Sequence, residues 1–232
     1  MSIWEKVSQS ASGLLSAGDA LLALLGRDGG DRKPQRDIAF TIGLIALCAK
    51  MAKADGEVTR DEVAAFEQVF DVPEAEAENV RRFFDQARGS IAGYESYARR
   101  LAGHFRDRPG VLEDVLDALF HIAKADRHVD ERELVYLGTV ARHFGFSELE
   151  YARIKAAHLG AGEADAYLIL GLDSAASAEE IRAAYRRLVR ENHPDALIAR
   201  GIPTEFVALA TEKLAAINAA YERLTKNRYV GA

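Results

Sequence analysis

The chain has 232 residues, of which 49% are hydrophobic and 28% are charged. This composition is typical of a globular protein with room for two ordinary domains, and it excludes a disordered chain. The formal net charge of -6 argues against a general nucleic-acid binder, which would be basic. The single cysteine, Cys48, excludes an internal disulfide and a cysteine-rich zinc module. We therefore expect a reducing, cytoplasmic compartment.

Residues 1–25 predict an amphipathic helix, because apolar residues recur every three or four positions from Trp4 to Leu25. The stretch also holds Glu5 and Lys6, so it is too polar for a membrane span of about 20 apolar residues, and it lacks the features of a secretory signal. The helix packs on its own domain, lies peripherally on the inner membrane surface, or pairs with a second copy. Residues 26–34 form a polar, glycine-rich linker, so we assign residues 1–33 to the helix and linker.

Residues 34–160 predict an all-helical domain with an internal repeat. Helical periodicity runs from Asp37 to His158 without a strand pattern. Residues 53–63 align with residues 124–134, and each copy follows an apolar helix, predicted at residues 38–52 and 111–123. The domain therefore consists of two related helical hairpins, joined by an amphipathic segment at residues 73–105.

Each copy of the repeat carries acidic residues that have two interpretations. Thr59 with Glu62, and Asp130 with Glu133, have the spacing of a helix capping box, in which each side chain satisfies a backbone amide. Alternatively, the repeat brings four acids together as a divalent-cation site, for which oxygen ligands suit calcium or magnesium. The four candidate ligands are Asp55, Glu62, Asp126 and Glu133.

This pair of motifs resembles the TerB-like domain, which is named for tellurite-resistance proteins. The resemblance implies a helical bundle, and some members of that family are thought to bind divalent ions through such acids. Residues 159–163 then predict a short hinge to a C-terminal domain at residues 161–232.

The C-terminal domain is organised around a basic amphipathic helix that runs into His193, Pro194 and Asp195. Ile181, Tyr185 and Leu188 form its apolar stripe, and its cationic face holds Arg182, Arg186, Arg187 and Arg190. Pro194 lacks an amide proton and disfavours the helical conformation at the preceding residue. We therefore expect the helix to stop there and to present His193 and Asp195 on an exposed loop. A second helix at about residues 204–224, with Ile217 and Tyr221 in its stripe, packs antiparallel on the first.

These residues, in this order and spacing, resemble the J-domain of DnaJ-type co-chaperones, in particular the DjlA subfamily, whose C-terminal J-domain follows a TerB-like domain. The resemblance implies an all-α protein that is a co-chaperone and not an enzyme. Its basic helix would dock on an acidic surface of a DnaK-type ATPase chaperone, and His193-Pro194-Asp195 would stimulate ATP hydrolysis. The protein would also recruit that chaperone to specific clients, and nothing in the chain requires a cofactor.

Two departures from family habit bear on this interpretation. DjlA-like proteins commonly begin with a membrane anchor, and the larger DnaJ proteins carry a glycine/phenylalanine-rich segment and a zinc module, none of which is found here.

The alternative function is a stress-responsive sensor, in which the TerB-like domain binds calcium or magnesium and the J-domain is accessory. The sequence holds neither a nucleophile elbow nor a metalloprotease motif, so a hydrolase is not expected.

Overall fold

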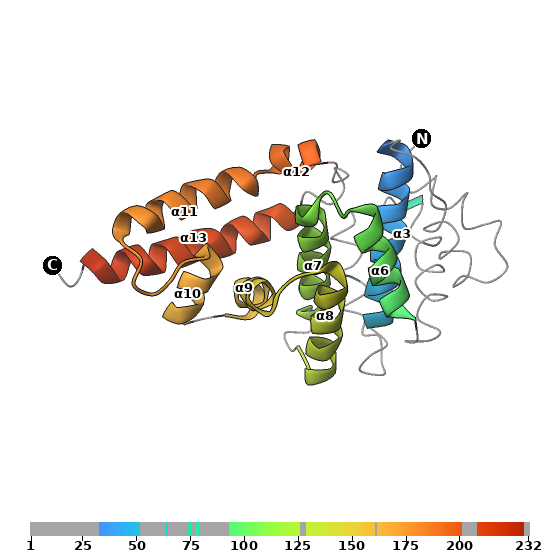
Figure 1. The fold of residues 1–232 in the computed structure, drawn as a ribbon, viewed down its shortest axis with the longest axis horizontal. Helices are drawn as coiled ribbons and strands as arrows, with labels where there is room; N and C mark the ends of the chain where they lie inside the picture. The colour runs from blue at the N-terminus through green and yellow to red at the C-terminus, as the bar shows by residue number, and fades with distance from the viewer. Residues whose placement is uncertain are drawn as a thin grey trace. The chain divides into compact units, whose positions relative to one another are not determined.

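The structure, a computed structural model, describes residues 33–51, 64, 74–75, 78, 93–125, 129–160, 162–200 and 208–229. Every element within these residues is a helix, which confirms the predicted all-α fold (Figure 1). The chain divides into two compact units, Met1–Gly145 and Phe146–Ala232, which we call the first and second units. The helix predicted at residues 1–25 lies outside the described residues, as do the first repeat copy and most of the segment at residues 73–105.

The described part of the first unit contains four helices: α3 (Lys33–Met51), α6 (Tyr94–His104), α7 (Pro109–Ala123) and α8 (Glu131–Phe144). The apolar helices predicted at residues 38–52 and 111–123 correspond to α3 and α7. The start of α3 corrects the predicted linker, since Pro34 lies in the first helical turn, where a missing amide proton costs nothing. Helices α3 and α8 each pack on both α6 and α7.

The core of the first unit follows from how apolar its helices are. From Leu44 to Met51 every residue of α3 is buried, as expected for a helix that is apolar on nearly all sides. Cys48 is fully buried among these residues, and burial raises the pKa of its thiol well above the ordinary value, so it acts as a small apolar side chain. Gly43 allows α3 and α6 to approach closely, because a Cβ atom at this position would overlap the side chain of Leu101.

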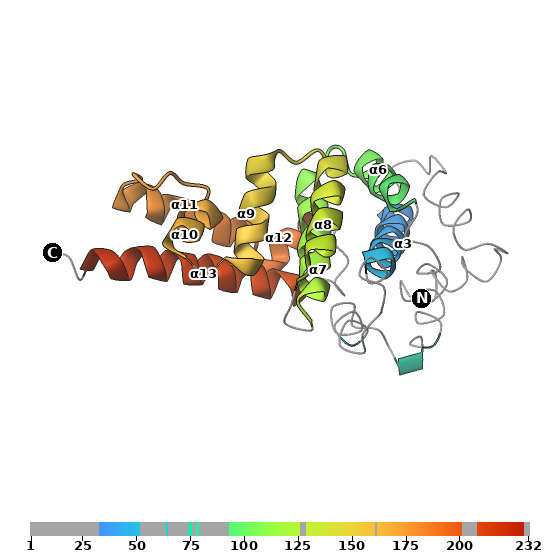
Figure 2. The same cartoon turned by 90° about the horizontal axis from the view of Figure 1, so that it is seen from below.

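The second unit contains α9 (Glu148–Leu159), α10 (Glu163–Leu170), α11 (Ala178–Glu191), α12 (Pro194–Arg200) and α13 (Ala208–Tyr229). Helices α11 and α13 lie side by side and run in opposite directions, as predicted, and α10 packs on both (Figure 2). Helix α13 continues past the predicted end at Leu224 because no glycine or proline stops it before Tyr229. The second unit has its own apolar cluster, built mainly from Leu170, Ile181, Leu188, Ile217 and Leu224.

Among the helices that the structure describes, none is both long and apolar enough to cross a bilayer.

Candidate functional site

The basic helix α11 begins at a capping box formed by Ser177 and Glu180, three residues apart in the sequence. The backbone amide and the hydroxyl of Ser177 both donate to the Glu180 carboxylate, each at 2.7 Å, and the Glu180 amide donates back to Ser177 Oγ at 3.2 Å. These bonds satisfy amides that an uncapped helix would leave without partners. They also favour the charged form of the carboxylate, and so lower the pKa of Glu180.

One side of α11 is fixed against α13. Ile181, Ala184 and Leu188 are buried in the apolar cluster, together with Ile217 of α13. The predicted core residues Leu188 and Ile217 are therefore in the core. The other two, Tyr185 and Tyr221, are half-buried, and their rings stack with centroids 4.1 Å apart and an interplanar angle of 16°.

The other side of α11 is cationic and exposed. Arg182, Arg186, Arg187 and Arg190 all project from this side with exposed side chains. Within the part of the chain that the structure describes, none of these four guanidinium groups forms a salt bridge. Because these side chains are exposed, their charge can act on an external anionic surface.

Helix α11 ends at a cap that the sequence analysis missed. Asn192 is only 5% exposed, and both its backbone amide, at 3.0 Å, and its side-chain amide, at 2.8 Å, donate to the carbonyl oxygen of Leu188. A buried amide side chain that satisfies a helix-end carbonyl holds the following residue in a fixed direction. The sequence did carry a signal for this cap, since asparagine is common at helix ends.

His193 directly precedes α12, and Pro194 and Asp195 lie in its first turn, which corrects the loop predicted at Asp195. The carbonyl oxygen of His193 accepts from the amides of Ala196, at 2.9 Å, and Leu197, at 3.1 Å, so His193 is the residue that precedes the helix. Pro194 occupies the first helical position, where its fixed φ suits a helix and its missing amide proton is not needed. Asp195 follows in the first turn, where a negative charge is favoured by the helix dipole. The proline that ends α11 therefore also starts α12.

The side chains of His193 and Asp195 are 55% and 88% exposed, as predicted. The amide of Asp195 donates to His193 Nδ1 at 3.2 Å, which assigns the ring proton of the neutral histidine to Nε2. His193 Nδ1 also lies 3.5 Å from Oδ2 of the Asp195 carboxylate. Both polar side chains are thus accessible to a partner at this short turn.

The turn is held from the far side by Leu197. This residue is 2% exposed, and α12 packs on both α11 and α13. Asn192 on one side and Leu197 on the other therefore fix the position of His193-Pro194-Asp195 relative to the cationic side of α11.

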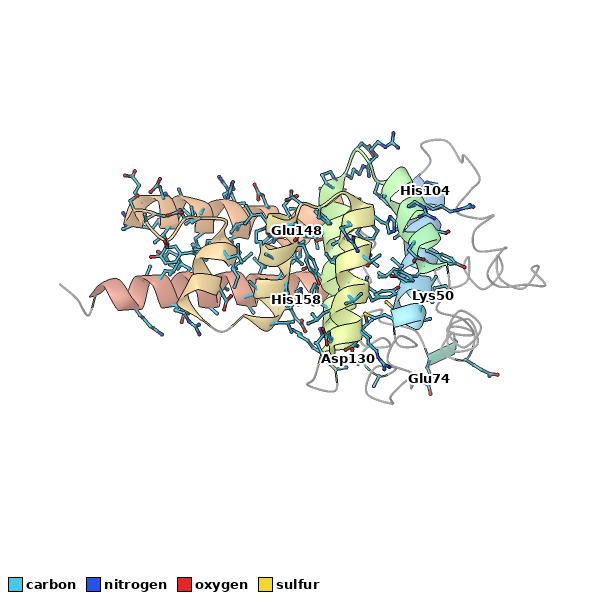
Figure 3. The ribbon with its side chains drawn as sticks, turned by 60° about the horizontal axis from the view of Figure 1, so that its bottom comes forward. Lys50, Glu74, His104, Asp130, Glu148 and His158 are labelled. Atoms are coloured by element: carbon cyan, nitrogen blue, oxygen red, sulfur yellow. The ribbon has the colours of Figure 1, made fainter. Side chains whose placement is uncertain are left out.

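The acidic residues of the first unit were predicted either to cap helices or to hold a cation. Asp130 and Glu133 form a capping box at the start of α8: the Glu133 amide donates to Asp130 Oδ1 at 2.8 Å, and the Asp130 amide donates to Glu133 Oε2 at 2.9 Å. Figure 3 shows Asp130 at that end of α8. Asp55, Glu62 and Asp126 lie outside the described residues, as does Thr59, so the calcium or magnesium site stays a prediction. Among the residues that are described, no three potential ligand side chains gather at one point.

Two buried polar contacts in the first unit are structural. The hydroxyl of Tyr136 donates to the carbonyl oxygen of Leu47 at 2.8 Å and joins α8 to α3, and burial raises the pKa of this phenol well above its ordinary value. The ammonium of Lys50 lies 5.4 Å from the centre of the Tyr97 ring. Figure 3 labels Lys50 near one end of α3. Burial lowers the pKa of Lys50, because the charged form loses solvation there.

Two family models match successive parts of the chain. The family model described as Tellurite resistance protein TerB matches residues 41–156, and the DnaJ domain model matches residues 165–229. No solved structure matches the chain.

Relatives named Co-chaperone protein DjlA match this chain either over most of its length or over about a quarter of it. The one from Photobacterium profundum is 27% identical over 84% of this chain and 79% of its own length. The one from Aliivibrio fischeri is 26% identical over 86% of this chain and 82% of its own. A shorter match, to the protein from Coxiella burnetii, reaches 50% identity but covers 28% of this chain and about a quarter, 24%, of that relative.

Proposed function

The chain belongs to the DjlA-like family of J-domain co-chaperones, with a TerB domain followed by a DnaJ domain, and on this basis we propose that it stimulates ATP hydrolysis by a DnaK-type chaperone. The observation that carries the proposal is the placement of His193, Pro194 and Asp195. They form an exposed, capped turn at the end of the cationic helix α11. The chain itself acts by binding, and the chaperone hydrolyses ATP.

The cationic side of α11 would act first, when the chain and the chaperone meet. Four exposed arginines on one helix attract an acidic surface and orient the second unit before contact. The whole chain carries a net charge of -6, so this attraction is a local property of the α11 surface and not of the chain as a whole. The partner is therefore met in one orientation, with the turn at the end of α11 directed toward it.

The turn itself supplies the specific contacts. His193 offers an N–H at Nε2, and Asp195 offers a carboxylate, to groups on the chaperone. Because Pro194 fixes φ and the turn is held by Asn192 and Leu197, little conformational entropy is lost when these groups bind. A rigid pair of polar groups is suited to favour one conformation of the chaperone over another.

The test is steady-state ATP hydrolysis by the cognate DnaK-type chaperone with the wild-type chain, His193→Gln or Asp195→Asn. We expect the wild type to stimulate hydrolysis several-fold and both variants to lose most of the stimulation. His143→Gln, the same substitution in α8 of the first unit, is the matched control and should stimulate like the wild type. Circular dichroism of each variant would show that the helices are retained. Absence of stimulation by the wild-type chain would exclude the proposed activity.

Client recruitment is the second part of the proposal. A single cysteine leaves no zinc module to present unfolded clients, so we assign client selection to the first unit. Proximity labelling with the full chain and with a chain lacking the first unit tests this assignment. The two sets of labelled proteins should differ, and identical sets would contradict it.

A further inference from the structure

Helix α9 lies mostly within the region that the TerB model matches, but its packing assigns it to the J-domain. The TerB match runs to residue 156 and so includes most of α9. The compact units, however, divide between Gly145 and Phe146, which places all of α9 with the J-domain. Helix α9 packs on α10 and on α13. Figure 3 labels Glu148 and His158 near its two ends.

The contact between α9 and the J-domain is apolar and continuous with the J-domain core. Ala156 is 6% exposed and belongs to the same cluster as Ala166 and Leu170 of α10 and Ala220 of α13. Ala157 packs against that cluster from the same helix. One end of α9 therefore covers apolar surface that α10 and α13 would otherwise present to water.

In the connection from α9 to α10, Gly160 and Gly162 lie close to Asp165 of α10, although residues 159–163 predict a hinge. The Gly160 amide donates to the carbonyl oxygen of Ala156 at 2.8 Å, which closes the end of α9. A Cβ atom on Gly160 would lie only 2.8 Å from Cβ of Asp165, so the backbone there approaches α10 closely. The Asp165 carboxylate in turn accepts from the Gly162 amide at 2.8 Å. The glycines serve close approach here, and not flexibility.

The connection from α8 to α9 has a different character, because each helix is closed by its own cap. Gly145 ends α8 with φ of 90°, a conformation that glycine adopts without strain. Ser147 begins α9 with a capping box, in which its amide donates to Glu150 Oε2 at 2.8 Å. These bonds are local to each helix, and only Phe146 lies between the two caps.

We propose that α9 is the first helix of the J-domain in this protein, a brace that folds and unfolds together with α10 and α13. Residues 145–147 are then the connection between the two folding units. This inference concerns folding and does not depend on the ATPase activity proposed above.

The first experiment uses the wild-type full chain in native-state hydrogen exchange with increasing denaturant, read by mass spectrometry. Amides of α9 should share their opening free energy and denaturant dependence with those of α10 and α13, because they belong to one cooperative unit. If the α9 amides follow those of α8, or open before either group, the proposal is wrong.

The second experiment compares two variants of the full chain that place the same new charge on α9. Ala156→Glu puts a carboxylate into the apolar contact, whereas Leu149→Glu puts it at a site that is 70% exposed. We expect Ala156→Glu to increase exchange at least tenfold in α9, α10 and the facing part of α13, and Leu149→Glu to exchange like the wild type. A full loss of protection across the second unit in Ala156→Glu also supports the brace. An increase confined to α9 would overturn it.

Discussion

At the scale of single residues, the pair Tyr185 and Tyr221 joins α11 to α13 at the surface. The rings stack, and the Tyr185 hydroxyl donates to Asn218 Oδ1 at 3.0 Å. Stacked aromatic pairs contribute about 0.5–1.5 kcal/mol beyond the apolar area that they bury. An exposed hydrogen bond between neutral groups contributes less, because water replaces it when it breaks. The ring should therefore matter more than the hydroxyl.

This comparison gives a prediction for the stability of the second unit. Tyr185→Phe keeps the stacked ring and should reduce the free energy of unfolding by about 0.5 kcal/mol, whereas Tyr185→Ala should reduce it by about 2 kcal/mol or more. Asn218→Ala should add little to Tyr185→Phe, since both remove the same bond. Hydrogen exchange of the α11 amides measures all three values. A Tyr185→Phe variant as unstable as Tyr185→Ala would show that the hydroxyl dominates.

At the scale of an element, α11 is capped at each end by a side chain. Ser177 and Glu180 cap its first turn, and Asn192 caps its last. Between them, the buried residues Ile181, Ala184 and Leu188 decide which side faces α13 and so which side presents the arginines. The direction of the cationic surface is therefore a consequence of the apolar stripe on the opposite side.

The capping box makes the stability of α11 depend on pH. The pKa of Glu180 is lowered from its ordinary value of 4.5 in the folded chain, so folding favours the ionised carboxylate. Its contribution to stability is fully present above pH 4.5 and is lost as the pH falls through the lowered folded-state pKa. Glu180→Gln keeps a hydrogen-bond acceptor but cannot ionise. Protection of α11 amides should therefore fall less between neutral and acidic pH in Glu180→Gln than in the wild type, and equal losses would contradict the assignment.

At the scale of the whole molecule, an acidic chain presents a local cationic surface. In the docking proposed above, the exposed arginines of α11 attract an acidic surface of the chaperone although the whole chain carries a net charge of -6. Such steering acts on the association rate more than on the dissociation rate. It is screened by salt, since the Debye length falls from about 30 Å at 0.01 M to about 3 Å at 1 M.

Association with the DnaK-type chaperone should therefore slow as salt rises, and stopped-flow measurement of the association rate tests this. Replacing Arg182 and Arg186 together by Gln should lower the rate several-fold at low salt and flatten its salt dependence. Replacing Arg99 and Arg142 by Gln makes the same change in net charge on exposed positions of α6 and α8, and should alter the rate little. If both double variants behave alike, the net charge and not the α11 surface controls association.

The local structure of this protein was predictable from its sequence. The apolar runs of α3 and α7, the capping box of Asp130 and Glu133, and the two-sided pattern of α11 each depend on residues within one or two helical turns. The same holds for the family, because the order and spacing of residues around His193-Pro194-Asp195 are carried by the chain itself. The exposure of His193 and Asp195 also followed from the sequence alone, since proline must end the preceding helix.

What the tertiary structure decided is which surfaces meet. The sequence could not show that Pro194 begins a new helix, because the choice between a loop and a helix depends on the burial of Leu197 and on the packing of α12 against α11 and α13. Nor could it assign α9 to the J-domain, because glycines at positions 160 and 162 predict a hinge by composition but allow close packing when a helix lies beside them. Helix caps and periodicity are local properties of a sequence, whereas burial is shared between residues far apart in it, as between Ala156 of α9 and Ala220 of α13.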